Sequence, residues 1–304
     1  MIYVSSVAKI PGRRTSRADL HLHSTRSDGA YSPSQLVDLA RRSSLAAVAL
    51  TDHDTLSGLA EAQAAAGTSL EVVPGVEITS EYHTRELHLL GYFVRPDNIP
   101  LVTTLGRLCV HRNQRFWRMV DRLRGLGVSL ADEEVRACAV TESLGRRHLA
   151  DLLVRTHRAG SVREAFSRYL ADLSLVPKLR LPVREAIALV VGAGGVAAWA
   201  HPSYDCTRKT LSELRLLGLQ AVEVEYAGMR PSRIHELRCW ARELGLAVTG
   251  GSDCHGPEPL HRSVGSCSIS SAELDELRGM ARSPWPASRV VVVPPCAALV
   301  PAEE

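Results

Sequence analysis

The apolar residues of the first ninety positions fall in short runs separated by amphipathic segments. Residues 18–23 predict a brief strand that ends in histidines, and the continuous apolar run at 46–50 is typical of a strand buried on both faces. Ser32 and Pro33 suit the N-cap and first turn of a helix, because the apolar residues that follow recur with helical spacing. The same pattern predicts a helix at 55–66 and strands at 70–73 and 87–93.

The pattern changes near residue 97, where helical periodicity replaces the alternation of strands and helices. Amphipathic segments at 105–126, 132–138, 146–156 and 162–170 predict helices, and no strand pattern precedes about residue 182. These segments have regular apolar spacing and no low-complexity tract, which argues against a linker. We therefore interpret residues 97–181 as an all-helical insertion.

Strand–helix alternation then resumes and continues to the end of the chain. Helices are expected at 183–191, 211–217 and 233–244, and strands at 196–200, 221–226, 247–250 and 290–293. Alternating units predict a parallel sheet with right-handed crossovers. About seven units favour a barrel, although periodicity alone also fits an open sheet. The expected organisation is an N-terminal extension at 1–17, a barrel from 18–96 and 182–304, and the helical insertion between them.

Composition is that of a globular protein, with 45% hydrophobic and 23% charged residues in a chain of 304. No run approaches the roughly 18 apolar residues of a membrane helix, and residues 1–17 lack the apolar core of a signal peptide. We therefore expect a cytoplasmic protein with no membrane partner, and nothing indicates an obligate protein partner. The seven cysteines are odd in number and scattered without a CxxC pair, which fits reduced thiols.

Charge is distributed unevenly, although the net charge is only +3. Residues 101–180 contain fifteen Lys or Arg against eight Asp or Glu, whereas the remainder contains twenty-one against twenty-five. This asymmetry predicts an anion-attracting segment beside an acidic, metal-binding one. The alternative is a solvated helical surface in a chain that is rich in arginine throughout.

Histidines and carboxylates recur at the ends of the predicted strands. His21 and His23 are two residues apart on an extended segment, so both imidazoles share one face. Barrel enzymes hold their chemistry at the carboxyl ends of their strands. Nitrogen and oxygen ligands without clustered thiolates suit Mn²⁺, Zn²⁺ or Fe²⁺. The nine candidate ligands are His21, His23, Asp28, His53, Glu77, His88, His201, Asp253 and His255.

Each candidate has an ordinary explanation when taken alone. Asp28 fits plain turn chemistry, and His88 fits a core histidine with a hydrogen-bond partner. Asp52 and Asp54 could act around the site by orienting His53. The occurrence of all nine candidates in one chain is the stronger indication of a metal site. Nine ligands are too many for one ion. Three divalent ions that share carboxylates would use them all.

Seven motifs, taken in order, resemble those of the PHP family (polymerase and histidinol phosphatase domains). They are Asp19-Leu20-His21-Leu22-His23-Ser24, Ser27-Asp28-Gly29, Thr51-Asp52-His53-Asp54, Pro74-Gly75-Val76-Glu77, Leu87-His88-Leu89-Leu90-Gly91-Tyr92, Ala200-His201-Pro202 and Gly251-Ser252-Asp253-Cys254-His255-Gly256. The resemblance spans nearly the whole chain. It implies a distorted (β/α)₇ TIM-like barrel with a trinuclear metal centre that hydrolyses phosphoesters.

The resemblance also implies how the nine ligands are shared among the three ions. One ion would be held by His21, His23 and Asp253. A second would be held by Glu77, His88 and His201, with Glu77 bridging to the first. The third would be held by Asp28, His53 and His255.

The helical insertion resembles that of the stand-alone bacterial branch of the family. The matching segments are 145–150, 164–170 and Pro177-Lys178, and Arg147 stands where that branch commonly has a proline. Members of the branch act on nucleoside 3′,5′-bisphosphates or trim short RNA from its 5′-phosphate end. The substrate implied is therefore a nucleotide or a short 5′-phosphorylated oligonucleotide.

The mechanism that we expect is attack on phosphorus by a water that the ions activate. His53, Glu77 and Asp253 are the expected catalytic residues. Arg146 and Lys178 would clamp the substrate phosphate, arginine in bidentate fashion and lysine as a point charge.

Two other functions are compatible with parts of the sequence. One is a histidinol-phosphate-type phosphatase, for which the large basic insertion has no evident use. The other is a catalytically silent metal-binding module, which a missing ligand would have favoured. Tyr226 and Trp199 are candidates to stack on a nucleobase, or are core residues.

Overall fold

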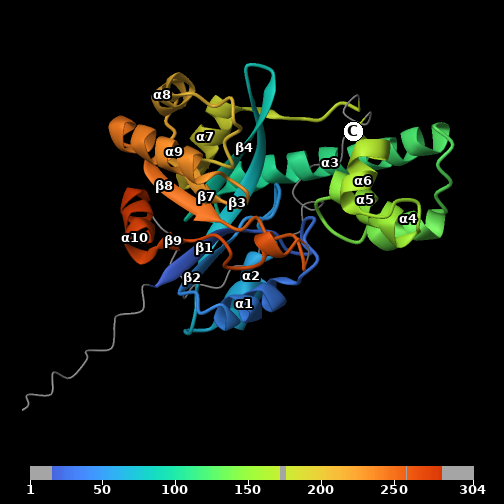
Figure 1. The fold of residues 1–304 in the computed structure, drawn as a ribbon, viewed down its shortest axis with the longest axis horizontal. Helices are drawn as coiled ribbons and strands as arrows, with labels where there is room; N and C mark the ends of the chain where they lie inside the picture. Colours follow the sequence, from blue (N-terminus) through green and yellow to red (C-terminus); the bar gives the residue numbers. More distant parts are fainter. Residues whose placement is uncertain (1–15, 172–175, 258, 283–304) are drawn as a thin grey trace, which may run out of the picture.

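Nine strands of the described residues form one sheet that curls into a nearly closed barrel (Figure 1). The structure is a computed structural model, which describes residues 16–171, 176–257 and 259–282. The strands are β1 (Arg17–Leu22), β2 (Ala47–Leu50), β3 (Glu71–Tyr82), β4 (Arg85–Tyr92), β5 (Leu181–Pro182), β6 (Val196–Trp199), β7 (Ala221–Tyr226), β8 (Ala247–Gly251) and β9 (Ile269–Ser270). Their spatial order is β8-β7-β6-β4-β3-β2-β1-β9, and β5 pairs with β3. The barrel fold predicted from the sequence is confirmed.

The expectation of a wholly parallel sheet is wrong at one hairpin and one edge. β4 is antiparallel to both β3 and β6, and β9 is antiparallel to β1. The cause is the two-residue connection His83-Thr84, in which both residues have positive φ, at 48° and 65°. A connection of two residues can join only antiparallel neighbours. The β3–β4 hairpin therefore interrupts the succession of parallel units.

β3 is also much longer than the predicted strand at 70–73. It continues through Pro74-Gly75 to Tyr82, so Glu77 lies within a strand and not beyond its end. Pro and Gly usually interrupt strands, which explains the early stop in the prediction. Gly75 is needed here, because a Cβ at this position would lie 2.9 Å from the carbonyl oxygen of Leu50.

The barrel closes where its first and last parallel strands meet. Beyond β8, the backbone N–H of Asp253 donates to the carbonyl oxygen of His21 at 2.9 Å. The N–H of His23 donates to the carbonyl oxygen of Cys254 at 3.1 Å. We call this contact the seam. It joins two of the sequence motifs directly through their backbones.

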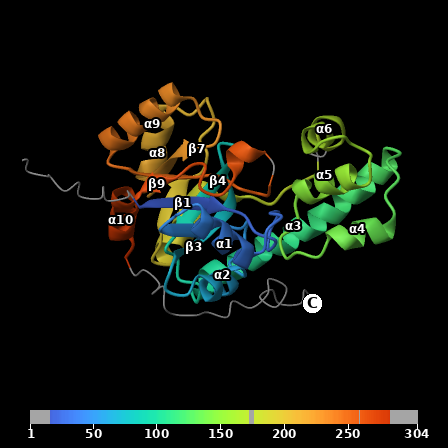
Figure 2. The same ribbon diagram turned by 60° about the horizontal axis from the view of Figure 1, so that its bottom comes forward.

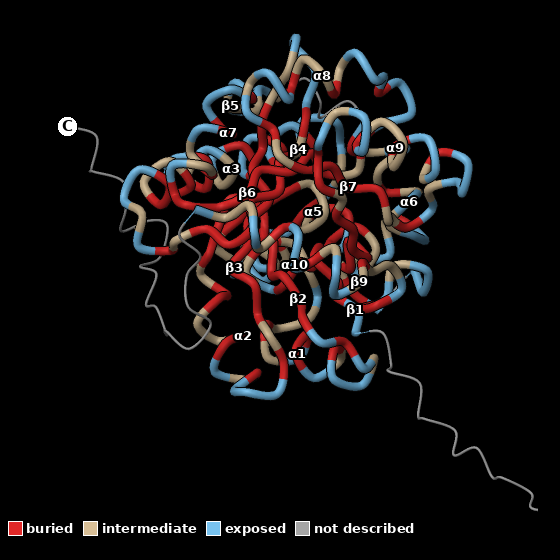
Figure 3. The backbone as a smooth tube through the Cα atoms, turned by 90° about the vertical axis from the view of Figure 1, so that its left-hand side faces the viewer, coloured by how far each residue is buried: buried red, intermediate tan, exposed pale blue. Residues whose placement is uncertain are grey.

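Helices surround the barrel and leave its strands buried at the centre of the molecule (Figure 3). The helices of the described residues are α1 (Pro33–Arg42), α2 (Leu59–Ala66), α3 (Ile99–Gly125), α4 (Asp132–Cys138), α5 (Arg146–Arg155), α6 (Val162–Ala165), α7 (Val183–Gly192), α8 (Arg208–Leu216), α9 (Pro231–Leu244) and α10 (Ser271–Met280). Ser32 caps α1 as expected and forms a capping box with Gln35.

Several helix boundaries differ from the predicted ones. α3 begins at Ile99 with Asn98 as its N-cap, six residues before the expected start. The expected helix at 55–66 is helical only from Leu59, and the one at 162–170 ends in a π-helical turn, Phe166–Leu170. The predicted strand at 290–293 and most of the extension at 1–17 lie outside the described residues, and β1 itself begins at Arg17.

α3 connects the barrel to the other helices of the segment 97–181 (Figures 1 and 2). Its first half packs on the barrel through Leu101, Leu105 and Leu108. Its second half extends outward, and α4, α5 and α6 gather around it. A separate apolar cluster there includes Phe116 and Leu149. This separate core supports the predicted helical insertion, whose standing as a domain of its own stays a prediction.

Candidate metal centre

All nine candidate ligands lie together at one end of the barrel. They come from β1 and the loop after it, from the loop after β2, from β3 and β4, and from the segments after β6 and β8. In three groups, one potential ligand atom from each residue lies within 4.8 Å of all the others in the group. These groups are His23, Asp28, His53 and His255; His21, His23 and Asp253; and His53, Glu77 and His88.

The Glu77 carboxylate faces five imidazoles. Its Oε1 lies 2.8 Å from His88 Nδ1 and 3.0 Å from His201 Nε2. Its Oε2 lies 3.0 Å from His53 Nδ1, 3.2 Å from His23 Nε2 and 3.5 Å from His21 Nε2. Burial opposes ionisation of this carboxyl, but the surrounding imidazoles hold its pKa well below the usual range. An ionised carboxylate in this position can bridge two cations.

His21 and His23 present their Nε2 atoms to each other at 3.1 Å. The Oδ1 of Asp253 lies 3.4 Å from the first of these nitrogens and 3.2 Å from the second. Two nitrogens bound tetrahedrally to one zinc ion, each at roughly 2.1 Å, are separated by about 3.4 Å. The three atoms therefore have the spacing of ligands to a single ion.

The third group surrounds the Oδ1 atom of Asp28. His255 Nε2 lies 3.3 Å from it, His53 Nε2 3.8 Å and His23 Nδ1 3.9 Å. Asp28 Oδ1 and His23 Nδ1 are buried and have no hydrogen-bond partner among the described residues. Leaving buried polar atoms unsatisfied is costly, and a cation would satisfy both at once. The residues present fit a divalent metal.

His53 is in the protonation state that a metal ligand requires. Burial lowers the pKa of its imidazole to about 4, against the opposing charges of Glu77 and Asp28. The ring is therefore neutral near pH 7, with a free nitrogen lone pair.

Glu223 supports the centre from β7, and the sequence analysis missed it. It is completely buried, its Oε1 lies 2.9 Å from His21 Nδ1, and its Oε2 accepts the backbone N–H of His201 at 2.6 Å. A carboxylate on the far nitrogen of a ligating imidazole fixes both the tautomer and the ring orientation. The only signal in the sequence was an acidic residue in an apolar strand.

Asp253 is held by two further residues. The hydroxyl of Tyr226 donates to its Oδ2 at 2.9 Å, and Arg262 forms an ion pair with the same oxygen. The Arg262 guanidinium also lies 4.9 Å from the centre of the Tyr226 ring. These contacts leave Oδ1 directed at the histidines of β1. Tyr226 therefore contacts the centre, whereas Trp199 is a core residue.

The alternative in which Asp52 and Asp54 orient His53 is wrong. Asp52 accepts hydrogen bonds from Ser24 and Ser27, and thereby braces the loop after β1. Asp54 accepts from Thr79 and from Arg112 Nε, the latter at 2.6 Å. Both carboxylates fasten neighbouring backbone segments.

A cavity of about 120 Å³ opens beside the metal-centre residues Asp28, His53 and His88. Five cationic residues line it, and we call it the basic cavity; they are Arg112, Arg115, Arg146, Arg147 and Lys178. The structure thus places both predicted phosphate-binding residues beside the predicted ligands. Arg112 and Arg115 were missed, although their spacing puts them on one face of α3.

Lys178 is tied to the centre through Glu86. Its Nζ donates to Glu86 Oε1 at 2.6 Å, and the same oxygen lies 2.9 Å from His88 Nε2. Burial lowers the pKa of Lys178 to about 8, and the positive charge of Arg112 acts in the same direction. Arg146 lies with its guanidinium 5.8 Å from the ring centre of Phe166. The cavity therefore concentrates positive charge beside a cluster of metal-ligand type.

Comparison with known proteins identifies the family. The PHP domain model matches residues 19–165. A 3′,5′-nucleoside bisphosphate phosphatase of Chromobacterium violaceum is 33% identical over 256 residues, covering 81% of this chain and 90% of that protein. The 5′-3′ exoribonuclease Rnm of Escherichia coli is 32% identical over 251 residues, covering 79% of this chain and 86% of that protein. The chain belongs to the PHP family.

Solved structures agree with this PHP assignment. A Bifidobacterium adolescentis protein provisionally assigned as a metal-dependent phosphoesterase superposes with a TM-score of 0.80 at 30% identity, covering 87% of this chain and 96% of that one. A Chromobacterium violaceum amidohydrolase with bound sulfate and no metal superposes with a TM-score of 0.79 at 30% identity. The match covers 90% of this chain and 99% of that one. As a PHP protein, this chain is a metal-dependent phosphoesterase that hydrolyses phosphoric esters, as the sequence predicted.

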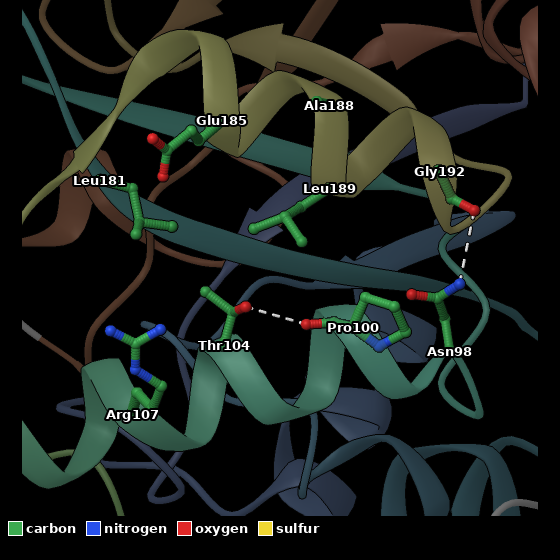
Figure 4. Close-up of a pocket in the computed structure, with 9 residues that line it drawn as sticks. All are labelled: Asn98, Pro100, Thr104, Arg107, Leu181, Glu185, Ala188, Leu189 and Gly192. Carbon is green, nitrogen blue, oxygen red and sulfur yellow. Dashed lines mark hydrogen bonds between the residues drawn. The ribbon is translucent and has the colours of Figure 1, made fainter.

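A groove elsewhere on the surface of the PHP chain lies apart from the metal centre. This groove of about 390 Å³ runs between α3 and α7, where Thr104 and Arg107 face Glu185 and Leu189 (Figure 4). None of the nine metal-centre residues lines it. Among the described residues, no helix combines the length and apolarity that crossing a membrane requires.

Proposed function

We propose that this protein hydrolyses a phosphate ester of a nucleotide, either a nucleoside 3′,5′-bisphosphate or the 5′ end of a short RNA. The observation that carries the proposal is the shared cavity, in which Asp28, His53 and His88 stand beside Arg146 and Lys178. The relatives named for these two activities each match about four-fifths of the chain. A small monophosphate would not need five cations beside the metal ligands.

Three divalent ions, Mn²⁺, Zn²⁺ or Fe²⁺, suit the nine ligands. The first would be held by His21, His23 and Asp253, the second by Glu77, His88 and His201, and the third by Asp28, His53 and His255. The three groups of nearby atoms overlap at His23 and His53, which supports several closely spaced ions over one. Ions of this kind activate water and neutralise charge on the oxygens of a reacting phosphate.

The residues of the basic cavity act on the substrate directly. Arg146 can hold a phosphate with two parallel hydrogen bonds, and Lys178 adds a compact positive charge. Arg112 is fixed by Asp54, so its charge stays in place as the substrate enters. Together these groups orient the phosphate toward the ligands and stabilise the negative charge that grows during attack.

His53, Glu77 and Asp253 are the residues that we assign to catalysis. Each of them contacts side chains of more than one of the three groups. Removing any of them would therefore disturb more than one ion. The protein would keep its fold, because His53 and Asp253 follow strands whose cores are apolar, and Glu77 lies in a strand between the buried apolar residues Val76 and Ile78.

A substrate panel tests the proposal. Protein loaded with Mn²⁺ is assayed with a nucleoside 3′,5′-bisphosphate, a 5′-phosphorylated RNA oligomer and histidinol phosphate. Release of phosphate or mononucleotide from either of the first two is the expected result. Activity on histidinol phosphate alone would replace the proposal by a small-molecule phosphatase. Inactivity on all three, with metal bound, would indicate a silent binding module.

Substitution of Arg146 or Lys178 by alanine tests the phosphate clamp. Loss of one charged hydrogen bond should raise KM for the nucleotide about tenfold or more, with a smaller change in kcat. Lys209→Ala is the matched control, because Lys209 is exposed on α8. Unchanged KM in both cavity variants would remove these residues from the substrate contacts.

A further inference from the structure

A second cavity adjoins the metal centre at His201 and Tyr226. Its volume is about 210 Å³, and it shares no lining residue with the basic cavity. Its walls come from residues 201–204, which follow β6, and from residues 226–229, which begin at the last residue of β7; Arg233 of α9 also lines it. We call it the tyrosine cavity. Its inner end is formed by residues that the metal centre already uses.

The walls of the tyrosine cavity are mainly apolar and aromatic. Tyr226 is half-buried, and its ring centre lies 5.3 Å from that of His201. Pro202 and Met229 add apolar surface. Tyr204 also lines the cavity and is 67% exposed, and the Arg230 guanidinium lies 6.0 Å from its ring centre. An exposed tyrosine ring beside a guanidinium is a surface on which a planar group can stack.

Arg233 adds a buried donor to this cavity. Its side chain is 8% exposed and donates to the carbonyl oxygens of Cys206, at 2.7 Å, and Ser203, at 3.3 Å. These bonds fasten the segment that carries Tyr204. The Arg233 Nε is buried and has no hydrogen-bond partner among the described residues. A ligand with an acceptor atom would satisfy this group.

We infer that the tyrosine cavity binds the planar heterocyclic base of a nucleotide whose phosphate lies at the metal centre. Apolar walls, an aromatic ring at an exposed position and a single unsatisfied donor match a flat ring that carries acceptor atoms. The cavity is smaller than the roughly 300 Å³ at which pockets for drug-sized ligands begin, so it suits one ring system.

A second phosphate is the weaker candidate for this space. The Arg233 guanidinium is already committed to Cys206, Ser203 and Glu236, and Arg230 lies over the Tyr204 ring. The five cationic residues of the basic cavity provide more positive charge for binding a phosphate than the tyrosine cavity does. The substrate would thus place its base in one cavity and a further phosphate in the other. This assignment rests on the proposed nucleotide substrate.

Two variants alter the cavity without touching a proposed ligand. Tyr204→Ala removes the exposed ring, and Met229→Trp fills the space. Each is compared on a nucleoside 3′,5′-bisphosphate and on the ribose bisphosphate that lacks the base. Loss of stacking should raise KM about five-fold or more for the nucleotide alone and leave kcat largely unchanged. Leu216→Ala, at a residue 80% exposed on α8, should change neither KM.

Direct binding of nucleosides supplies a readout that needs no turnover. Adenosine, guanosine, cytidine and uridine are titrated separately, and saturation-transfer NMR detects contact with the base protons. Contact in the unaltered protein, lost in Met229→Trp, is the expected result. Equal KM changes on both substrates, or nucleoside contact unaffected by both variants, would overturn the inference. Inactivity of the unaltered protein on every nucleotide would refute the proposed function, and the nucleoside titration would then decide the inference alone.

Discussion

Glu223 shows how a single buried carboxylate can organise two distant candidate ligands. One oxygen holds the ring of His21 on β1, and the other holds the backbone of His201 after β6. With a carboxylate on His21 Nδ1, the proton resides on that nitrogen and Nε2 is left free for a cation. The residue contacts no substrate-facing cavity, so its effect is on ligand position.

Glu223→Gln should weaken metal binding about 10–100-fold, because an amide fixes the imidazole less strongly than a carboxylate. The measurement is a titration of chelator-treated protein with Mn²⁺ or Zn²⁺. Glu225→Gln is the matched control on the same strand, since Glu225 pairs with Arg238 instead. Equal affinities for the two variants would show that Glu223 does not position the ligands.

His53→Ala and Asp253→Ala should each abolish turnover and leave the circular dichroism spectrum unchanged. The reason is that each removes a side chain that contacts candidate ligands of more than one of the three groups. Phosphate release and bound-metal content are measured together. Wild-type turnover in either variant would contradict the assigned centre.

At the residue scale, the sequence predicted the nine positions that the structure brings together, and their role as ligands stays a prediction. It could name them because short motifs mark them individually. It could not separate Glu223 from Glu225, since strand alternation assigns both to the same face. The structure has a register shift between these two residues, which leaves only Glu223 fully buried. Such a shift depends on pairing with β8 and is not visible within β7.

At the scale of elements, the β3–β4 hairpin and α3 mark the limits of pattern reading. His83-Thr84 is not a usual sequence for a turn with two positive φ angles, so the hairpin was not recognised. The start of α3 was expected at residue 105, whereas Pro100 occupies its first turn, where proline is favoured. The sequence pattern predicted the long elements with strong periodicity correctly. Their first and last residues depend on local backbone geometry, which the pattern does not show.

Gly251→Ala tests the seam between β1 and the end of β8. A Cβ at this position would lie 2.4 Å from the backbone nitrogen of His21, so the two segments must separate. Overpacking of this kind should lower the free energy of unfolding by about 1–3 kcal/mol, and metal affinity should fall as well. Urea unfolding and metal titration measure the two effects.

Gly279→Ala is the control for this substitution. Nothing lies within 4 Å of a Cβ at Gly279 in α10, so alanine should stabilise the helix by about 0.5–1 kcal/mol. If Gly251→Ala were as stable as Gly279→Ala, the close approach of the Gly251 and His21 backbones would not be required.

For the whole molecule, the proposed ions act as cross-links between strands. Each ion that binds only the folded state should add about 2.7 kcal/mol when its free concentration is one hundred times Kd. Chelation should therefore lower Tm by several degrees and abolish activity, and added Mn²⁺ or Zn²⁺ should restore both. Calorimetry with and without chelator gives the result, and a Tm insensitive to chelation would argue against metal at these sites.

The seam also determines when during synthesis the protein could become active. The amide of Ser252 and the carboxylate of Asp19 meet across 233 positions of the chain. A ribosome releases His21 and His23 early, but their partners Asp253 and His255 emerge only after all the other ligands. A nascent chain therefore has no complete centre. The proposed centre can take up its full set of ions only once translation has passed β8.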